Sequence, residues 1–333
     1  MKAPLPLLTI VAVLAAVGVS PLSTSPARAG TTLPVEGYLM ADKAARSVIA
    51  RNAAGITMVG VDGVVLTSRG NKLTTVPKAA KGMIAEAHSR RLKAELLVSN
   101  YSNSLGDFST ATAGRLLTSK KNRAAVVKSL VYKVKKRHFD GVQVDLESLK
   151  RSHGPGLTAF VKQLRAALPA RKAISMAVMA SERPSGYRNA GYQLDKLTKR
   201  IDRFVLMAYD QHGPGWSKAG PIGGTPWVKR VLAGFLAAPV PKAKIDLGVA
   251  EYAYRWRANS TRGSSMSVAR ARKLAGDRAR YDTRQQEWTA TLADGTVLWW
   301  SDATTFAARK TLAQQYQLHG LAVWELSLGD TIS

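Results

Sequence analysis

Three acidic residues lie in or beside an apolar run in the stretch FDGVQVDLES, residues 139–148. If this stretch is a β-strand, Gln143, Asp145 and Glu147 lie on one face and apolar side chains on the other. Charged groups are costly to bury unless they are paired or hydrogen-bonded. Two carboxylates placed together are also suited to acid–base chemistry on a substrate. The spacing therefore predicts a polar strand face whose acids contribute to a functional site.

The flanking sequence predicts where that polar face lies. A basic helical pattern precedes the strand at 122–138, and another helical pattern follows it at 156–168. A strand between two helices is typical of a parallel sheet that is covered on both sides, so the polar face must line an interior. In a closed β/α barrel, that interior opens to solvent at the C-terminal ends of the strands. Asp145 and Glu147 fall at that end.

Strand and helix patterns alternate along the rest of the chain. We expect helices over 79–91, 192–201, 225–238 and 302–316, with Thr225 and Asp302 as N-caps and Pro226 opening the third of them. The expected strands cover 35–41, 56–66, 93–102, 141–147, 173–181, 203–210, 244–254 and 320–328. Eight strands alternating with helices predict an α/β fold, a (β/α)8 TIM barrel.

Residues 255–300 interrupt this alternation. They contain two alternating runs on either side of the turn ADGT, which predicts a β-hairpin. We expect a small α+β insertion between strand seven and the last helix, and a single catalytic barrel over 30–333.

The first 29 residues have the pattern of a signal peptide. Lys2 precedes a short apolar run, and ARA at 27–29 is a small-x-small cleavage site. The apolar run is short for a membrane span. The pattern predicts a secreted protein that starts near Gly30, with no stable membrane span; the alternative is an uncleaved membrane anchor.

The composition excludes several kinds of chemistry. There are no cysteines, which excludes thiol catalysis and cysteine metal sites. The five histidines show no paired spacing, so we expect neither a metal nor a cofactor. The net charge of +27 at pH 7 indicates anionic partners, and for an exported protein wall polymers or lipid headgroups are favoured over nucleic acid. The alternative is a basic surface that serves solubility alone.

Three motifs in chain order resemble glycoside hydrolase family 18. The fourth strand of that family carries D-x-x-D-x-D-x-E, and residues 140–147 match it in register apart from Gln143. The sixth strand resembles the family's M-x-Y-D at Met207 to Asp210, and the eighth resembles its tryptophan-bearing strand at Trp324. The insertion after strand seven also matches. The resemblance covers nearly all of the chain after residue 29.

The chain departs from the family pattern in two places. Gln143 replaces a carboxylate that shares hydrogen bonds and charge with the middle Asp. Family chitinases tend to carry Ser-x-Gly-Gly on strand three, where this chain reads VSNYSNS, residues 98–104. Together with MAYDQHGPG and VWELSLGD, these departures resemble the bacterial spore-cortex and cell-wall N-acetylglucosaminidase branch more than the chitinases.

The resemblance implies substrate-assisted retaining catalysis on a β-1,4 bond next to N-acetylglucosamine. Glu147 is then the acid that protonates the glycosidic oxygen. Asp145 holds the acetamido N–H and stabilises the oxazolinium charge, and Tyr209 donates to the acetamido oxygen. The nucleophile is the acetamido oxygen of the sugar itself.

The other candidate residues have less specific expectations. Gln143, Met207 and Asp210 are expected to contact substrate, with a supporting position as the alternative for Asp210. Trp324 is expected to stack on the sugar rather than fill core, and Asp140 to be structural. Three further expectations concern loops and strand ends: Asn100 and Tyr101 line the cleft, and Trp216 either stacks on sugar or covers the barrel edge.

These features predict a monomeric, secreted or wall-associated glycosidase that acts on GlcNAc-containing polysaccharide, with anionic peptidoglycan as the favoured substrate and no nucleic-acid partner. A chitinase is the second interpretation. A lectin-like barrel without activity is the third, although such barrels usually lack the acid that Glu147 supplies.

Overall fold

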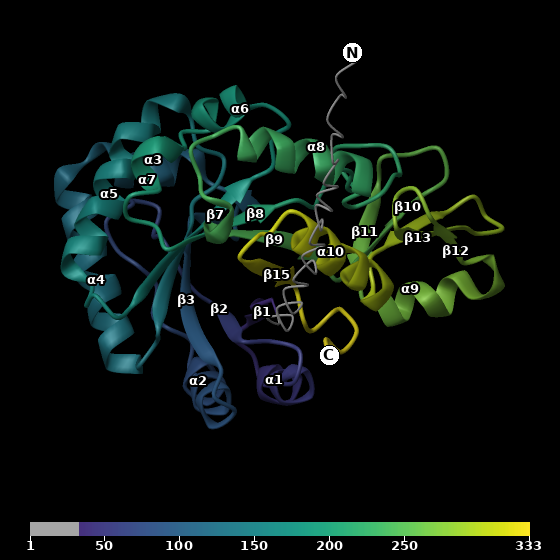
Figure 1. The fold of residues 1–333 in the computed structure, drawn as a ribbon, viewed down its shortest axis with the longest axis horizontal. Helices are drawn as coiled ribbons and strands as arrows, with labels where there is room; N and C mark the ends of the chain where they lie inside the picture. Colours follow the sequence, from purple (N-terminus) through teal and green to yellow (C-terminus); the bar gives the residue numbers. More distant parts are fainter. Residues whose placement is uncertain (1–32) are drawn as a thin grey trace, which may run out of the picture. The chain divides into compact units, whose positions relative to one another are not determined.

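The computed structural model describes residues 33–333, and its centre is a closed barrel of eight parallel strands (Figure 1). The barrel order is β1-β15-β9-β8-β7-β6-β3-β2. The strands are β1 (Val35–Met40), β2 (Met58–Val65), β3 (Lys93–Ser99), β6 (Gly141–Asp145), β7 (Ala173–Met179), β8 (Arg203–Met207), β9 (Ile245–Ala250) and β15 (Gly320–Trp324). The predicted (β/α)8 barrel is confirmed.

Helices surround the barrel and bury their apolar sides against its strands (Figure 1). They are α1 (Ala45–Asn52), α2 (Ala80–Ser89), α3 (Thr110–Thr118), α4 (Lys120–Arg137), α5 (Gly154–Ala167), α6 (Pro184–Asn189), α7 (Leu194–Leu197), α8 (Thr225–Leu236) and α10 (Ala303–Gln315), with short 3₁₀ turns at Arg151–His153 and Lys242–Lys244. The outward side chains of the strands are apolar because helices cover them, as in other parallel sheets.

Two helix predictions need correction. The helix expected over 192–201 ends after one turn as α7, since β8 already starts at Arg203. The N-cap of α8 is Gly224 rather than Thr225. The Thr225 hydroxyl instead donates to Gln286 Oε1 at 2.7 Å and accepts from Arg309 Nη1 at 2.6 Å, so tertiary contacts occupy it. Asp302 caps α10 as expected, because its carboxylate accepts from the first backbone N–H groups of the helix.

Asp140 holds the start of β6 in place. Its Oδ2 accepts from the backbone N–H of Ala94 and contacts His88 Nε2, both at 2.9 Å, and its Oδ1 lies 3.5 Å from Lys172 Nζ. Burial alone would raise the pKa of Asp140, but these hydrogen bonds and charges lower it. Its contacts are those of a structural residue.

The insertion between β9 and α10 is a small α+β unit. Its five-stranded sheet has the order β11-β10-β14-β13-β12, and α9 packs on it around a separate apolar cluster (Figure 1). The elements are β10 (Ala253–Trp256), β11 (Gly263–Met266), α9 (Val268–Ala275), β12 (Arg280–Asp282), β13 (Glu287–Thr291) and β14 (Val297–Trp300). The hairpin around ADGT is confirmed, but the unit begins at Ala253 because β10 pairs with β14 and not with the barrel.

A charged cluster fills the N-terminal half of the barrel interior. Arg203 lies 3.2 Å from Glu36, 2.9 Å from Glu95 and 2.5 Å from Asp246. Burial raises the pKa of Glu36 to about 7 although Arg203 acts to lower it. Three carboxylates around one guanidinium leave this part of the barrel short of positive charge.

The predicted signal peptide and its boundary at Gly30 lie outside the described residues. Within residues 33–333, no helix is both long enough and apolar enough to cross a membrane.

Candidate active site

A cavity of about 730 Å³ opens at the C-terminal ends of the barrel strands. Four carboxylates line it, together with aromatic and apolar side chains. Eight of the nine predicted site residues are among the lining residues: Tyr101, Gln143, Asp145, Glu147, Met207, Tyr209, Asp210 and Trp324. The tertiary structure therefore brings together residues on or just after β3, β6, β8 and β15, which are far apart in the sequence. This is where an active site is expected in such a barrel.

Asp145 and Glu147 form a buried, hydrogen-bonded pair of carboxyl groups. Asp145 is the last residue of β6, and Glu147 follows two residues later on the same face. Burial, the charge of Asp145 and a hydrogen bond between the two groups raise the pKa of Glu147 well above its ordinary value. Burial and the charge of Asp62 raise the pKa of Asp145 to about 7, although its hydrogen bond to Glu147 acts to lower it. The pair is thus arranged to keep a proton on Glu147 near neutral pH.

The prediction for Asn100 was wrong in position. Asn100 is fully buried and does not line the cavity. Its Oδ1 accepts from the backbone N–H of Glu147 at 2.9 Å, and its Nδ2 donates to the Glu147 carbonyl at 3.0 Å and to the Ser109 carbonyl at 3.1 Å. Asn100 therefore holds the backbone of Glu147 just beyond the end of β6.

Tyr209 and Asp210 lie just beyond the end of β8. Burial, followed by the charges of Glu147 and Asp210, raises the pKa of Tyr209, so its hydroxyl remains a hydrogen-bond donor. The Asp210 carboxylate accepts from the hydroxyls of Tyr252 at 2.5 Å and Tyr254 at 2.9 Å. Burial nevertheless raises its pKa. Since Tyr254 belongs to β10, these bonds join the cavity to the insertion.

The side-chain amide of Gln143 is turned toward the interior cluster. Its Nε2 donates to Glu36 Oε2 at 3.3 Å and to Ser175 Oγ at 3.1 Å. Ser175 in turn donates to Glu95 at 2.6 Å. A glutamine can donate to this carboxylate-rich cluster, whereas an ionised aspartate would add a further negative charge.

Aromatic side chains form two walls of the cavity. The rings of Trp324 and Tyr38 lie 5.8 Å apart, and those of Tyr101 and Phe108 meet edge to face at 5.4 Å. Gly60 on β2 makes room for the Tyr38 ring, because a Cβ there would lie 2.2 Å from Tyr38 Cδ1. Such walls suit the apolar faces of sugar rings.

Trp216 lies apart from this cavity. It is 60% exposed, is not one of the lining residues, and meets the Tyr254 ring edge to face at 6.3 Å. Of the two expectations for Trp216, its contacts fit a cover at the junction between the loop after β8 and the insertion.

Sequence reasoning missed several lining residues, among them Tyr38, Asp62 and Trp227. A signal for Asp62 was present, because an acid within the apolar run VGVDGVV is the same pattern that marked Asp145. Tyr38 lies within the first strand pattern, VEGYLMA, but nothing in that pattern marks it as a site residue. Trp227 had no such signal, since it lies in the first turn of α8 and reaches the cavity only through the fold.

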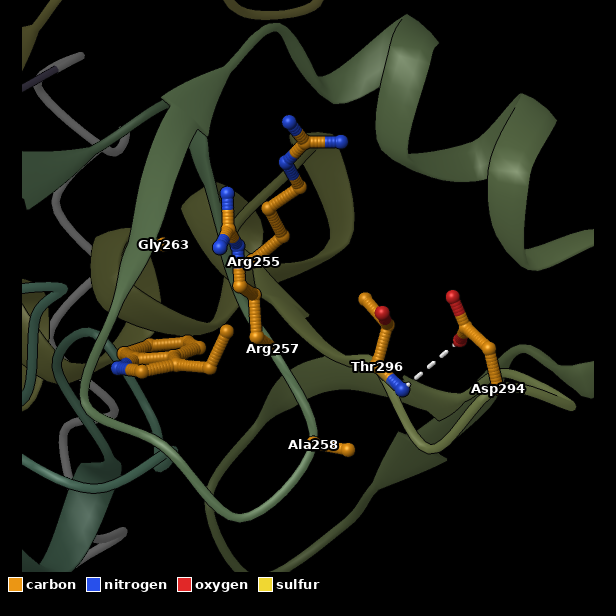
Figure 2. A pocket seen from close by; sticks show the side chains of 7 residues that line it. Arg255, Arg257, Ala258, Gly263, Asp294 and Thr296 are labelled. Carbon is orange, nitrogen blue, oxygen red and sulfur yellow. Dashed lines mark hydrogen bonds between the residues drawn. The ribbon is translucent and has the colours of Figure 1, made fainter.

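A second cavity of about 390 Å³ lies in the insertion (Figure 2). Arg255 and Arg257 extend from adjoining positions at its wall, and Asp294 accepts from the backbone N–H of Thr296 at 2.9 Å. It contains no pair of carboxyl groups and no buried titratable side chain, so we assign the chemistry to the barrel cavity. Within residues 33–333, no three His, Cys, Asp or Glu side chains gather in a way that could hold a metal ion.

The family model for glycosyl hydrolases family 18 matches residues 41–329. The chain belongs to this family. It is therefore a glycosidase, and the family resemblance of the strand motifs is confirmed.

Similar proteins include a glycosylase, a spore cortex-lytic enzyme and a chitinase. The uncharacterized glycosylase YvbX of Bacillus subtilis (strain 168) is 22% identical over 87% of this chain and 86% of that protein. The spore cortex-lytic enzyme SleL of Bacillus cereus superposes with a TM-score of 0.80, 18% identity and coverage of 90% of this chain and 72% of that one. A chitinase from Chromobacterium violaceum ATCC 12472 superposes with a TM-score of 0.79, 25% identity and coverage of 90% and 95%.

Proposed function

We propose that this family 18 glycosidase is secreted and cleaves β-1,4 bonds next to N-acetylglucosamine in peptidoglycan-type polymers, by substrate-assisted retaining catalysis. The observation that carries this proposal is the hydrogen-bonded Asp145–Glu147 pair beside Tyr209 in one cavity, with aromatic walls. Retaining enzymes with two protein carboxylates use one as nucleophile, whereas this family is an exception in which the substrate supplies the nucleophile.

Glu147 would be the general acid. Its raised pKa keeps it protonated when the substrate binds, so it can give its proton to the glycosidic oxygen as the C1–O bond breaks. The acetamido oxygen of the same sugar attacks C1, which leaves a cyclic oxazolinium ion and a free hydroxyl on the leaving sugar. Glu147, now ionised, then takes a proton from the water that opens this ring, and the anomeric configuration is retained.

Asp145 and Tyr209 would align the acetamido group. An ionised Asp145 accepts the acetamido N–H and stabilises the positive charge that develops on the nitrogen. The Tyr209 hydroxyl donates to the acetamido oxygen and points it at C1. Positioning of this kind accounts for several kcal/mol of barrier lowering in intramolecular reactions, with about 7–11 kcal/mol as the upper range.

The remaining cavity residues would bind sugar rings. Trp324, backed by Tyr38, offers a flat apolar surface beneath the reacting sugar. Tyr101 with Phe108 offers a second one on the β3 side. Met207 and Asp210 line the β8 side, where Asp210 can accept from a sugar hydroxyl.

The helix α4 supports an anionic polymer as the substrate. It carries eight Lys and Arg residues and no acid among its 18 residues. None of these eight forms an ion pair with a carboxylate of residues 33–333. Burial and the nearby charge of Arg137 lower the pKa of Lys133, and Lys136 lies over the exposed ring of Tyr132. An exposed, unpaired basic helix of this kind attracts polyanions such as bacterial wall polymers.

Chitin is the second candidate substrate. The 25% identity to a protein described as a chitinase favours it, and both polymers present the same N-acetylglucosamine unit. Chitin is neutral, however, and would gain nothing from α4. A lectin-like function is disfavoured, because Glu147 is present and its pKa is raised.

The test is to incubate the pure protein with purified peptidoglycan and with colloidal chitin, and to analyse the new reducing ends by mass spectrometry. We expect fragments from peptidoglycan that end in reducing N-acetylglucosamine. Faster release from chitin would favour the chitinase, and binding without release from either would favour a lectin. The variant Glu147→Gln serves as the control for contaminating hydrolases.

A further inference from the structure

One carboxylate oxygen of Asp145 lacks a hydrogen-bond partner among residues 33–333, although Asp145 bonds to Glu147. The residue is almost fully buried, and the oxygen concerned is Oδ1. The preceding inward residue on β6 is Gln143, whose side-chain nitrogen donates to Glu36 and Ser175. Position 143 therefore serves the interior cluster and contributes no carboxylate for Asp145.

Another carboxylate occupies the same row of the barrel as Gln143. In the strand register, Gln143 pairs with Leu97 on β3, and Leu97 pairs with Asp62 on β2. Residues paired across adjacent strands point to the same side of a sheet. Asp62, Leu97 and Gln143 consequently all face the barrel interior, and all three line the cavity.

A bulge in β2 gives Asp62 its position. The β2–β3 register shifts between Asp62 and Val64, so that Gly63 is the extra residue. Bulges of this kind redirect a side chain and often lie next to active sites. A Cβ on Gly63 would lie 2.6 Å from Leu96 Cδ1, which explains a glycine there.

Within the described part of the chain, the Asp62 carboxylate makes no contact that would explain an acid at this position by its contribution to the fold. It accepts no hydrogen bond from residues 33–333, so it does not hold the bulge together. Burial raises its pKa, and its charge is the main neighbouring influence that raises the pKa of Asp145. An unpaired acid on an apolar strand is costly unless it serves the site.

We infer that Asp62 is a positioning residue of the active site, a second carboxylate on the same part of the cavity wall as Asp145, separated from it by β3, which controls the charge state of Asp145 in place of the residue at position 143. This inference rests on the proposed function of Asp145, which must be ionised to accept the acetamido N–H. When Asp145 is ionised, a proton taken up from solvent by Asp62 removes the repulsion between the two groups, and no bond is made or broken.

Other ionisable groups also surround the pair. Glu147 bonds to Asp145 from the same element and is influenced by Asp210 after β8 and Asp107 on β5 (Asp107–Phe108). Glu325, after β15, is influenced by Asp42 and Asp62. The phenols of Tyr38, Tyr192 and Tyr209 face the same region, whereas no Lys, Arg or His lines the described cavity. Negative charge thus accumulates here without a local cation.

The experiment measures the titration of Asp145 directly. Carboxyl carbons of ¹³C-labelled aspartate are followed by NMR against pH in the wild-type protein and in Asp62→Asn, with Asp145→Asn used for assignment. Asp62→Asn should move the Asp145 midpoint to lower pH by about one unit, the order expected when one neighbouring like charge is removed. The acid limb of the kcat/KM profile should move in the same direction, because Asp145 must be ionised to act.

Two further variants show whether the effect belongs to Asp62. Asp62→Glu keeps the carboxylate and should keep the Asp145 midpoint near the wild-type value. Asp107→Asn removes a rim carboxylate that influences Glu147, so it should leave the Asp145 midpoint in place. The inference is overturned if Asp62→Asn leaves the Asp145 midpoint unchanged, or if Asp107→Asn moves it equally.

The titration does not depend on turnover, so the two proposals can fail separately. If no polymer is cleaved, the proposed function fails while the midpoints still test Asp62. If peptidoglycan is cleaved and the Asp145 midpoint does not respond to Asp62, only this inference fails.

Discussion

The barrel interior and the outer helix α4 have opposite charge arrangements. Eight of the 22 acidic side chains are buried, most of them inside the barrel or at its mouth, whereas among the Lys and Arg of residues 33–333 only Arg203 and Arg309 are buried. On α4, all eight basic side chains are exposed or half-buried, and the helix carries no acidic residue. The molecule therefore keeps its carboxyl groups where burial raises their pKa, and its bases where they can meet a polyanion.

The net charge of the whole chain does not show this difference, which assigns acid–base chemistry to the interior and attraction of polyanions to α4. Carboxyl groups inside the barrel act by their proton affinity, which depends on desolvation and neighbours and little on salt. Bases on α4 act through their field in water, which salt screens over about 8 Å at physiological ionic strength. The interior should therefore respond to pH and to single substitutions, and the exterior to ionic strength.

The largest expected effect comes from removing the acid. Glu147→Gln should lower kcat by about 10²–10⁴-fold, the usual contribution of a general acid, because glutamine has the same shape and no proton to give. Binding of a small GlcNAc oligomer should persist in calorimetry. Retention of more than a few per cent of the wild-type rate would remove Glu147 from its proposed position as acid.

Glu251→Gln is the matched control for that substitution. Glu251 is fully buried outside the cavity, and burial raises its pKa to about 9. Between its ordinary pKa of 4.5 and about 9, only the folded state holds this proton, so the free energy of unfolding falls as pH rises through that range. Glu251→Gln should therefore keep the turnover of the wild type. Compared with the wild type, the variant should be relatively more stable at pH 8 than at pH 5.

A smaller effect is expected when the support of Glu147 is removed. Asn100→Ala deletes both hydrogen bonds that hold the Glu147 backbone, and should lower kcat on the order of 10- to 100-fold with little change in KM. Asn52→Ala is a matched control, since Asn52 is equally buried and bonds to Val48 and Ile332 away from the cavity. Both should lose stability of about 1–3 kcal/mol, and an equal loss of kcat in Asn52→Ala would contradict a specific function for Asn100.

The departure at position 143 allows a test of the interior charge. Gln143→Asp adds a buried carboxyl beside Glu36, whose pKa is already raised to about 7 by burial. The folded state should then hold an extra proton near neutral pH, so the free energy of unfolding should fall further between pH 5 and pH 8 than in the wild type. The acid limb of the pH–rate profile should also move to higher pH, because Asp145 gains another like charge.

Gln143→Met separates charge from hydrogen bonding. It removes the bonds to Glu36 and Ser175 without adding a carboxyl, so its loss of stability should be similar at pH 5 and pH 8. If Gln143→Asp behaves in the same way as Gln143→Met, position 143 is electrostatically silent and the account of the interior cluster is wrong.

The smallest effect is expected on the exterior. Replacing three exposed lysines of α4 by glutamine, Lys128, Lys135 and Lys136, should weaken binding to intact bacterial walls roughly 3- to 10-fold at low salt. Raising salt to about 0.5 M should release the wild type and remove the difference between the two proteins. Turnover of a small neutral oligomer should stay unchanged.

Three exposed lysines on other elements, Lys218, Lys229 and Lys242, are the charge-matched control. Their replacement should weaken wall binding less than the α4 substitutions do. Equal weakening by the two sets of substitutions would mean that net charge alone governs attraction to the wall. Wall binding that does not change with salt concentration would show that the basic surface has no targeting function.

Local patterns in the sequence determined most of the fold and much of the site. Eight strand patterns with helices between them, the hairpin turn ADGT, and the acids at 145 and 147 were all readable, because side-chain alternation and turn chemistry depend on near neighbours in the chain. Two predictions about helix ends were wrong: α7 is one turn long, and Thr225 is not an N-cap, because tertiary contacts with Arg309 and Gln286 occupy its hydroxyl.

Only the tertiary structure decided which distant residues meet. Asn100 binds the backbone of Glu147 across 47 residues, and Gln143 donates to Glu36 across 107. Asp62 reaches the row of Gln143 because barrel closure sets the register of β2, β3 and β6, and a bulge in β2 adjusts it. Such pairings carry no sequence signal of their own, because burial and pKa depend on every strand that surrounds a side chain, and that enclosure exists only once the barrel has closed.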